Sequence, residues 1–139
     1  MKKQKKYAAM FLGISLGILS GCVKKIDPDV SRQEKKYVAV EEKEIPEGMK
    51  KRIDEKKKEP FEIMWTDREG ILYIAKGYGA CATTGYRAEA ESVTESEDTV
   101  FVETCLYGPE KGVEKEEVQS FPYLVILIED EGKEVVIDG

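Results

Sequence analysis

The sequence holds few side chains that could perform chemistry, and its three cysteines are the first to consider. Cys81 lies in the segment Ala80–Tyr86 (ACATTGY), which combines a thiol, two threonine hydroxyls, a glycine and a tyrosine. A nucleophilic cysteine needs a cationic or basic neighbour that lowers the pKa of its thiol. The chain contains no histidine, the commonest general base near neutral pH and the usual partner of serine and cysteine nucleophiles. We therefore predict no catalytic residue and no enzymatic activity.

The acidic residues do not form a metal-binding pattern either. Glu114, Glu116 and Glu117 stand close together, but they lack the alternating Asp or Asn ligands and the glycine of a calcium-binding loop. The absence of histidine also removes the commonest nitrogen ligand of zinc. A solvated acidic loop explains this segment better, and we predict no metal, no cofactor and no small-molecule substrate.

The N-terminus indicates export from the cell. Four lysines precede an apolar run, Tyr7–Leu19, which ends in small residues and a cysteine. This is the layout of a secretory signal, and the run is too short for a comfortable membrane span. Leu19–Cys22 (LSGC) resembles the lipobox of bacterial lipoproteins. The resemblance implies that residues 1–21 are a signal peptide, cleaved after Gly21, and that Cys22 carries lipid; an uncleaved anchor or a core helix is the alternative.

Lipidation at Cys22 fixes the expected location of the mature protein. Two acyl chains hold a protein stably at a membrane, whereas one chain does not. We expect an extracytoplasmic protein, lipid-anchored to the bacterial cell membrane through a polar tether over residues 22–35. Removal of residues 1–21 leaves 18 basic residues against 28 acidic ones, a net charge of about −10. Such an acidic chain is a poor ligand for nucleic acid, because binding to phosphates needs a basic surface.

Cys81 and Cys105 remain if Cys22 carries lipid. An even number of cysteines in an exported chain suggests a disulfide, and a bridge across this segment would contribute about 3–4 kcal/mol in the chain-entropy model. Two separate buried thiols are the competing interpretation, and the sequence leaves the choice open.

Residues 46–58 are expected to form an amphipathic helix. Pro46 suits the first helical position, and Pro60 ends the helix because proline lacks the N–H that a helix requires. Apolar residues recur every four positions on one face, at Ile45, Met49 and Ile53.

The chain after Pro60 has the pattern of strands joined by polar turns. Phe61–Trp65 and Tyr86–Val93 alternate between apolar and polar residues, as half-buried strands do. Tyr123–Ile128 is apolar on both faces and fits a central strand that is covered on both sides. We predict one mainly β domain over residues 36–139: a compact antiparallel sheet or sandwich with one N-terminal helix (α+β) that closes the open face of the sheet.

Three segments in this order carry a resemblance to a known family. They are GYGACATTGYRAEA, then GPEKG, then SFPYLVILIE, with the closest correspondence at Gly77–Tyr78, Thr83–Tyr86 and Phe121–Tyr123. Residues 76–129, which include these segments, resemble the C-terminal domain of the PrcB family, lipoprotein subunits of a secreted protease complex. The resemblance implies a non-catalytic accessory module that associates with or stabilises a protease or another envelope protein, with Thr83, Thr84, Gly85 and Tyr86 as the partner-binding loop.

The same loop supports an alternative function. Thr83–Tyr86 (TTGY) is similar to the loop that chagasin-type cysteine protease inhibitors, which are immunoglobulin-like sandwiches, insert into their targets. Small residues and a glycine allow the backbone to approach a cleft closely. Those inhibitors also use an Arg-Pro-Trp loop, whereas the single tryptophan here, Trp65, lies in a different sequence context. Inhibition therefore remains the second hypothesis, and a purely structural lipoprotein is a third.

Overall fold

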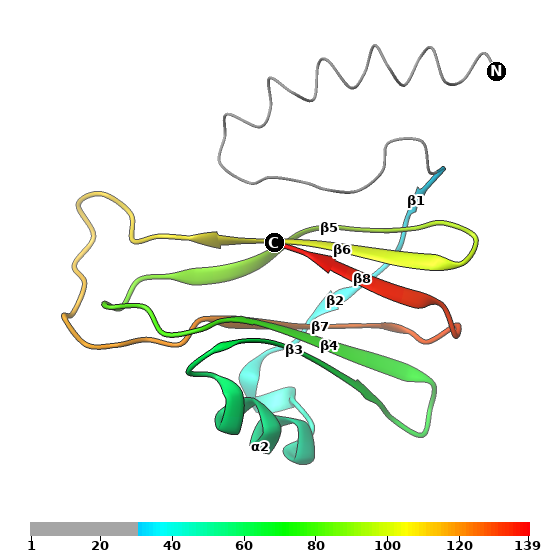
Figure 1. The fold of residues 1–139 in the computed structure, drawn as a ribbon, viewed down its shortest axis with the longest axis horizontal. Helices are drawn as coiled ribbons and strands as arrows, with labels where there is room; N and C mark the ends of the chain where they lie inside the picture. The colour runs from blue at the N-terminus through cyan, green and yellow to red at the C-terminus, as the bar shows by residue number, and fades with distance from the viewer. Residues whose placement is uncertain (1–30) are drawn as a thin grey trace, which may run out of the picture.

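The computed structural model describes residues 31–139 as two stacked β-sheets with one helix beneath them (Figure 1). The upper sheet in Figure 1, named sheet A here, contains β1 (Gln33–Glu34), β5 (Arg87–Glu95), β6 (Thr99–Tyr107) and β8 (Glu134–Asp138). The middle layer, sheet B, contains β2 (Val38–Ala39), β7 (Tyr123–Glu129), β4 (Ile71–Tyr78) and β3 (Pro60–Thr66). A short 3-10 helix, η2 (Glu42–Glu44), and the α-helix α2 (Glu47–Lys56) precede β3.

The order of strands is β1-β5-β6-β8 in sheet A and β2-β7-β4-β3 in sheet B. This architecture confirms the predicted fold class, a mainly β sandwich with one helix. Neighbouring strands are antiparallel except for β6 and β8, which are parallel. The exception arises because the chain reverses at the turn after β7 and crosses to the other sheet, so that β8 runs in the same direction as β6.

The main core lies between the two sheets. Its buried residues come from alternate positions of the facing strands, as period-two patterning requires. They are Leu72 and Ile74 of β4, Val93 of β5, Val100 and Val102 of β6, and Leu124, Ile126 and Ile128 of β7. The half-buried Val135 and Ile137 of β8 pack against this cluster.

The helix α2 covers the outer face of sheet B, as predicted. Met49 and Ile53 are fully buried there against Phe61 and Ile63 of β3. The helix is two residues shorter at its C-terminus than expected, because the chain turns after Lys56 towards Pro60, which begins β3. Pro46 precedes the helix as its N-cap.

The predicted central strand is β7, which lies between β2 and β4. Its residues contribute alternately to the core between the two sheets and to the apolar cluster between sheet B and α2. The strand β2, at the edge of sheet B beside β7, has only two residues. The structure also places β1 and Lys35 on the fold, although the sequence had assigned them to the tether. No helix within residues 31–139 is long and apolar enough to cross a membrane.

Candidate functional site

The predicted partner-binding loop lies at one end of the sandwich, next to a second and longer loop. The first loop joins β4 to β5 over residues 79–86, and the second joins β6 to β7 over residues 108–122. Figure 1 shows both at the left end of the molecule. We call this pair of loops the loop end. The two segments meet because β4 and β7 are antiparallel neighbours, so that the end of one strand lies beside the beginning of the other.

Backbone hydrogen bonds fasten the two loops to each other. Cys81 and Ser120 form a β-bridge in which each N–H donates to the carbonyl oxygen of the other residue, at 2.8 and 3.0 Å. Tyr78 N donates to Pro122 O at 3.1 Å. The pairing of β4 with β7 thus extends beyond the strands into the loops.

Thr83 and Thr84 are bonded to the second loop. Thr83 is buried, and the hydroxyl of Ser120 donates to its carbonyl oxygen at 2.7 Å. Thr84 N donates to Glu116 O at 3.0 Å, and Glu116 N donates to Thr84 Oγ1 at 2.8 Å. The carbonyl oxygen of Thr83 and the N–H and hydroxyl of Thr84 are therefore bonded within the protein, which disfavours insertion of Thr83–Tyr86 alone into a protease cleft.

Gly85 and Tyr86 pack against the start of the second loop. Gly85 has a φ of 95°, in a region that side chains with a Cβ rarely adopt. A Cβ at this position would approach Pro109 Cβ at 3.0 Å. Tyr86 is half-buried, with its ring beside Gly108. The structure thus brings all four predicted residues together, but as an internal support for the longer loop.

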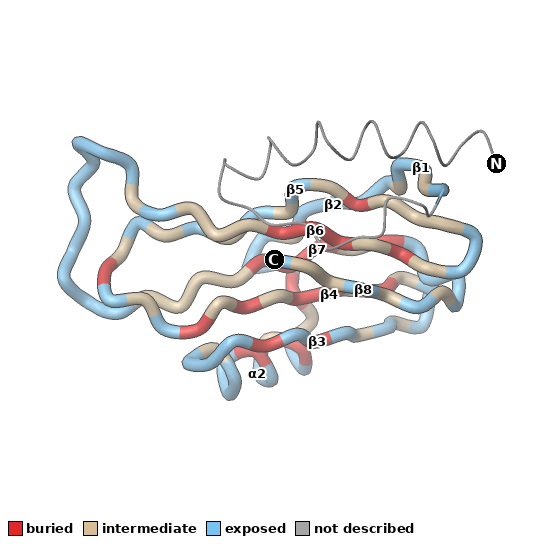
Figure 2. The backbone as a smooth tube through the Cα atoms, turned by 45° about the horizontal axis from the view of Figure 1, so that its top comes forward, coloured by how far each residue is buried: buried red, intermediate tan, exposed pale blue. Residues whose placement is uncertain are grey.

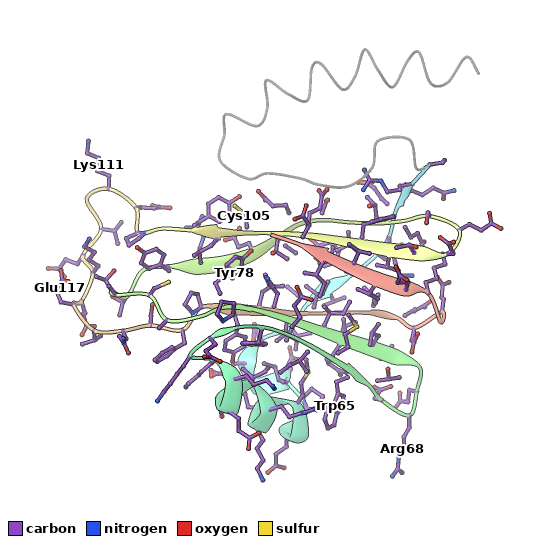
Figure 3. All side chains as sticks on the ribbon, viewed as in Figure 1. Trp65, Arg68, Tyr78, Cys105, Lys111 and Glu117 are labelled. Atoms are coloured by element: carbon purple, nitrogen blue, oxygen red, sulfur yellow. The ribbon has the colours of Figure 1, made fainter. Side chains whose placement is uncertain are left out.

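The longer loop provides the exposed surface of the loop end. Residues 110–119 are all exposed, and Figure 3 shows Lys111 and Glu117 projecting from them. Two apolar side chains stand in this segment, Val113 at 57% and Val118 at 53% exposed. Exposed apolar residues on an ordered loop are suited to contact another protein surface. No sequence pattern indicates this role, because the segment resembles an ordinary polar connection.

The expected bridge between Cys81 and Cys105 is not formed, because Cys81 is a free cysteine. Its loop continues sheet B, where it pairs with Ser120. Cys105 belongs to β6 in the other sheet, opposite Glu89 of β5. Side chains alternate along a strand, so Cys105 faces away from the core to which Val102 contributes (Figure 3). The pairing inferred from the even count of cysteines is therefore wrong for Cys81.

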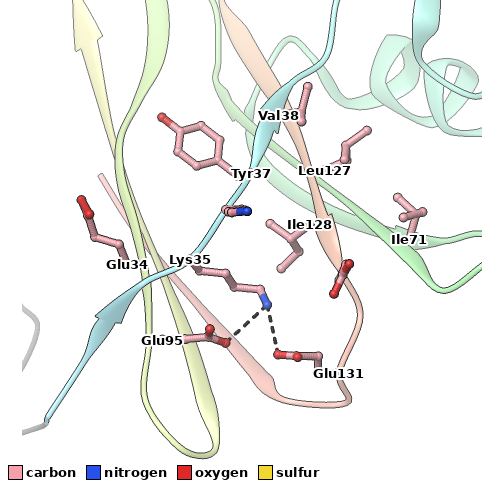
Figure 4. Close-up of a pocket in the computed structure, with 11 residues that line it drawn as sticks. Glu34, Lys35, Tyr37, Val38, Ile71, Glu95, Leu127, Ile128 and Glu131 are labelled. Carbon is pink, nitrogen blue, oxygen red and sulfur yellow. Dashed lines mark hydrogen bonds and ion pairs between the residues drawn. The ribbon is translucent and has the colours of Figure 1, made fainter.

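A separate pocket of about 550 Å³ lies at the opposite end of the sandwich. It forms where the chain crosses from β1 in sheet A to β2 in sheet B, and Tyr37, Val38 and Ile128 contribute apolar walls (Figure 4). The Lys35 side chain, only 7% exposed, crosses it to contact Glu95 at 3.3 Å and Glu131 at 3.1 Å.

Lys133 joins the same ion-pair network through a 2.8 Å contact with Glu95. Hydrogen bonding to Lys133, and secondarily to Lys35, holds the pKa of Glu95 below its ordinary value. The hydrogen bond to Glu95 in turn raises the pKa of Lys133. These ion pairs thus hold Lys35, the first residue of the segment between β1 and β2, to the end of β5 and to the turn that precedes β8. Sequence patterns did not reveal this network, since 60 residues separate Lys35 from Glu95.

The described residues offer no evident metal centre: residues 31–139 contain no group of three or more potential metal ligands of the His, Cys, Asp and Glu types in binding arrangement. The signal peptide, the lipidated Cys22 and most of the tether lie outside the described range, and these features remain predictions.

Comparison with known protein families finds a match for one part of the chain. Residues 72–129 match the family model described as PrcB C-terminal, in agreement with the resemblance noted for residues 76–129. The match runs from β4 through β7 and includes both loops of the loop end. No curated protein and no solved structure matches the chain.

Proposed function

We propose, from the premise that residues 72–129 form a PrcB C-terminal domain, that this protein is a non-catalytic accessory subunit of a protease complex. The family match is the observation that carries the proposal. A subunit of this kind stabilises the fold of its partner or keeps the partner at one location. This task requires a stable binding surface and no reacting groups.

The loop end is the surface that we assign to partner contact. It is the part of the matched domain where an exposed apolar pair, Val113 and Val118, stands on a loop held in place by hydrogen bonds. Such an ordered loop costs little conformational entropy when it binds.

The proposed lipid anchor suits this arrangement. The described chain enters the fold near β1, at the end opposite to the loop end (Figure 1). Ser31 lies nine positions after Cys22, and a fully extended segment of this length spans roughly 30 Å. An anchor at Cys22 would leave the loop end free to face away from the membrane, where a secreted partner is accessible.

Affinity capture from detergent-solubilised membranes tests the proposal, with the full chain as bait. We expect to recover a protease or a protein that assembles with one, and we expect the protease to survive longer with the bait than without it. The Val113→Asp and Val118→Asp double substitution should reduce recovery, and the matched control Lys111→Ala should not. Recovery of no protein partner contradicts the proposal.

Two further measurements test the lipid anchor and the alternative inhibitor hypothesis separately. Cys22→Ser should release the protein from the membrane fraction, whereas retention of this variant in membranes would contradict lipid anchoring. Prompt loss of activity in a papain-like protease on addition of the protein would favour the inhibitor hypothesis instead.

A further inference from the structure

The edge strand β3 is a second place where the protein can accept a partner. It is the last strand of sheet B in the order β2-β7-β4-β3. At seven residues it is also the longest edge strand, since β1 and β2 have two residues each and β8 has five. Strand edges present unpaired N–H and C=O groups and are templates for pairing with another chain.

The hydrogen-bond register decides which backbone groups of β3 face outward. Asp67 N donates to Ile71 O at 2.9 Å, just beyond the end of the paired region. In an antiparallel pair, residues that exchange hydrogen bonds alternate with residues that do not. Counting back from Asp67 along the uninterrupted register, the residues whose backbone groups bond to β4 are Trp65, Ile63 and Phe61.

The intervening residues, Glu62, Met64 and Thr66, therefore direct their N–H and C=O groups away from the sheet. The pairing on the far side of β4 agrees with this parity, because Tyr78 N donates to Pro122 O next to β7. All three outward residues are exposed, and Figure 2 shows β3 along the flank of the molecule. The helix α2 uses Met49 and Ile53 to pack against the face of β3 that carries Phe61 and Ile63.

β3 lacks most of the features that protect natural edge strands. Protected edges are short, bulged, or interrupted by proline and lysine. The register of β3 with β4 contains no bulge, Glu62 is its only charged residue, and Pro60 stands at its first position. Met64, in the middle of the edge, is 43% exposed.

We propose that β3 accepts an extended segment of the partner protein as a fifth strand of sheet B. This inference rests on the proposed function and adds a mode of binding to it. The added strand hydrogen-bonds to Glu62, Met64 and Thr66. Its side chains beside Met64 are apolar or β-branched, and a basic side chain lies beside Glu62, whose side chain is 47% exposed and also contacts Lys76 Nζ at 3.6 Å. Residues 31–139 contain 26 acidic and 16 basic residues, which further favours a basic segment.

Hydrogen exchange measured by NMR on the whole domain tests this proposal with a defined probe. The probe is a capped peptide of alternating valine and lysine residues, as long as β3, and the control peptide has proline at its centre. In the free protein, the amides of Glu62, Met64 and Thr66 should exchange much faster than those of Ile63 and Trp65. The probe should slow the exchange of the three outward amides by about tenfold or more, and the control peptide should not.

Two variants tie the effect to the strand edge. Met64→Pro removes the central outward N–H and leaves every hydrogen bond between β3 and β4 in place, so the peptide should no longer protect Glu62 and Thr66. Met64→Ala keeps the N–H and should retain protection. Should Met64→Pro fail to fold, Glu62→Arg provides the same test at an exposed position, because it repels the lysines of the probe.

Each remaining outcome decides between hypotheses. Unchanged exchange of the three amides at saturating probe overturns the edge proposal, and it leaves the proposed function standing if a protease partner is captured. Protection that grows with protein concentration, without any peptide, shows that a second copy of this chain occupies the edge and also overturns the proposal.

Discussion

Gly77 illustrates how a single residue determines the packing of side chains between sheet B and α2. It lies directly opposite Phe61 in the pairing of β3 with β4, and the Phe61 ring occupies the space that a Cβ at Gly77 would need. Phe61 in turn packs beside Tyr123, with ring centroids 6.3 Å apart. The sequence places a glycine in this strand but does not say which ring covers it.

We expect Gly77→Ala to lower the free energy of unfolding by about 1–3 kcal/mol, because the Phe61 ring must move in a filled core. Gly108→Ala is the matched control. Its Cβ would meet Tyr86 at 3.6 Å, an ordinary contact, so the change should stay within about 0.5 kcal/mol. Urea unfolding of both variants measures the difference; equal effects would contradict the role of the Phe61 ring.

Cys81 gives a second prediction at this scale. Because it is free and its backbone pairing with Ser120 does not involve the thiol, we expect Cys81→Ala to cost less than about 1 kcal/mol. A disulfide across this segment would contribute about 3–4 kcal/mol. Unfolding without reductant distinguishes the two cases, and a loss of the larger size would restore the bridge.

The elements show where sequence patterns suffice and where they fail. The half-buried strands β3 and β5 were predictable from alternation, since one buried face forces a period of two, and β7 was predictable from its continuous apolar run. The contact of Thr84 with Glu116 spans 32 residues and depends on the antiparallel placement of β4 and β7. Alternation along one strand gives no information about which strand lies beside it, so the partners of the predicted loop could not be inferred.

The crossing from β1 to β2 is another element-scale feature, and its ion pairs predict a pH dependence. The pKa of Glu95 is lowered in the folded protein. A carboxyl group of this kind stabilises the fold above its unfolded pKa, and the contribution is lost as the pH falls through its folded pKa. We expect the melting temperature of the wild type to fall more steeply between about pH 6 and pH 3 than that of Glu95→Gln.

The control for this experiment is Glu97→Gln, an exposed position in the turn that follows Glu95. Its melting temperature should follow the wild-type profile. Parallel profiles for Glu95→Gln and the wild type would show that the network of Lys35, Glu95 and Lys133 does not stabilise the fold through the charge of Glu95.

The two ends of the sandwich differ in structure. The loop end carries the exposed valines and the predicted loop, and the other end carries the entry of the chain and the Lys35 network. The class of this fold followed from the sequence, because an apolar helix face and half-buried strands must cover each other. The parallel pairing of β8 with β6 did not follow, since turns report a reversal of the chain but not a change of sheet.

That change of sheet has a consequence for the order in which the chain folds. The hairpins β3–β4 and β5–β6 are local and can form early, whereas β7 and β8 each join strands distant in sequence. Loop closure makes distant pairing slow. We expect Ile137→Ala in β8 to accelerate unfolding and to leave the folding rate nearly unchanged; stopped-flow kinetics in urea measure both rates, and a slowed folding rate would contradict this order. We expect the pairing of β7 with β4, which closes the longer loop, to be the slow step, and β8 to dock beside β6 after it.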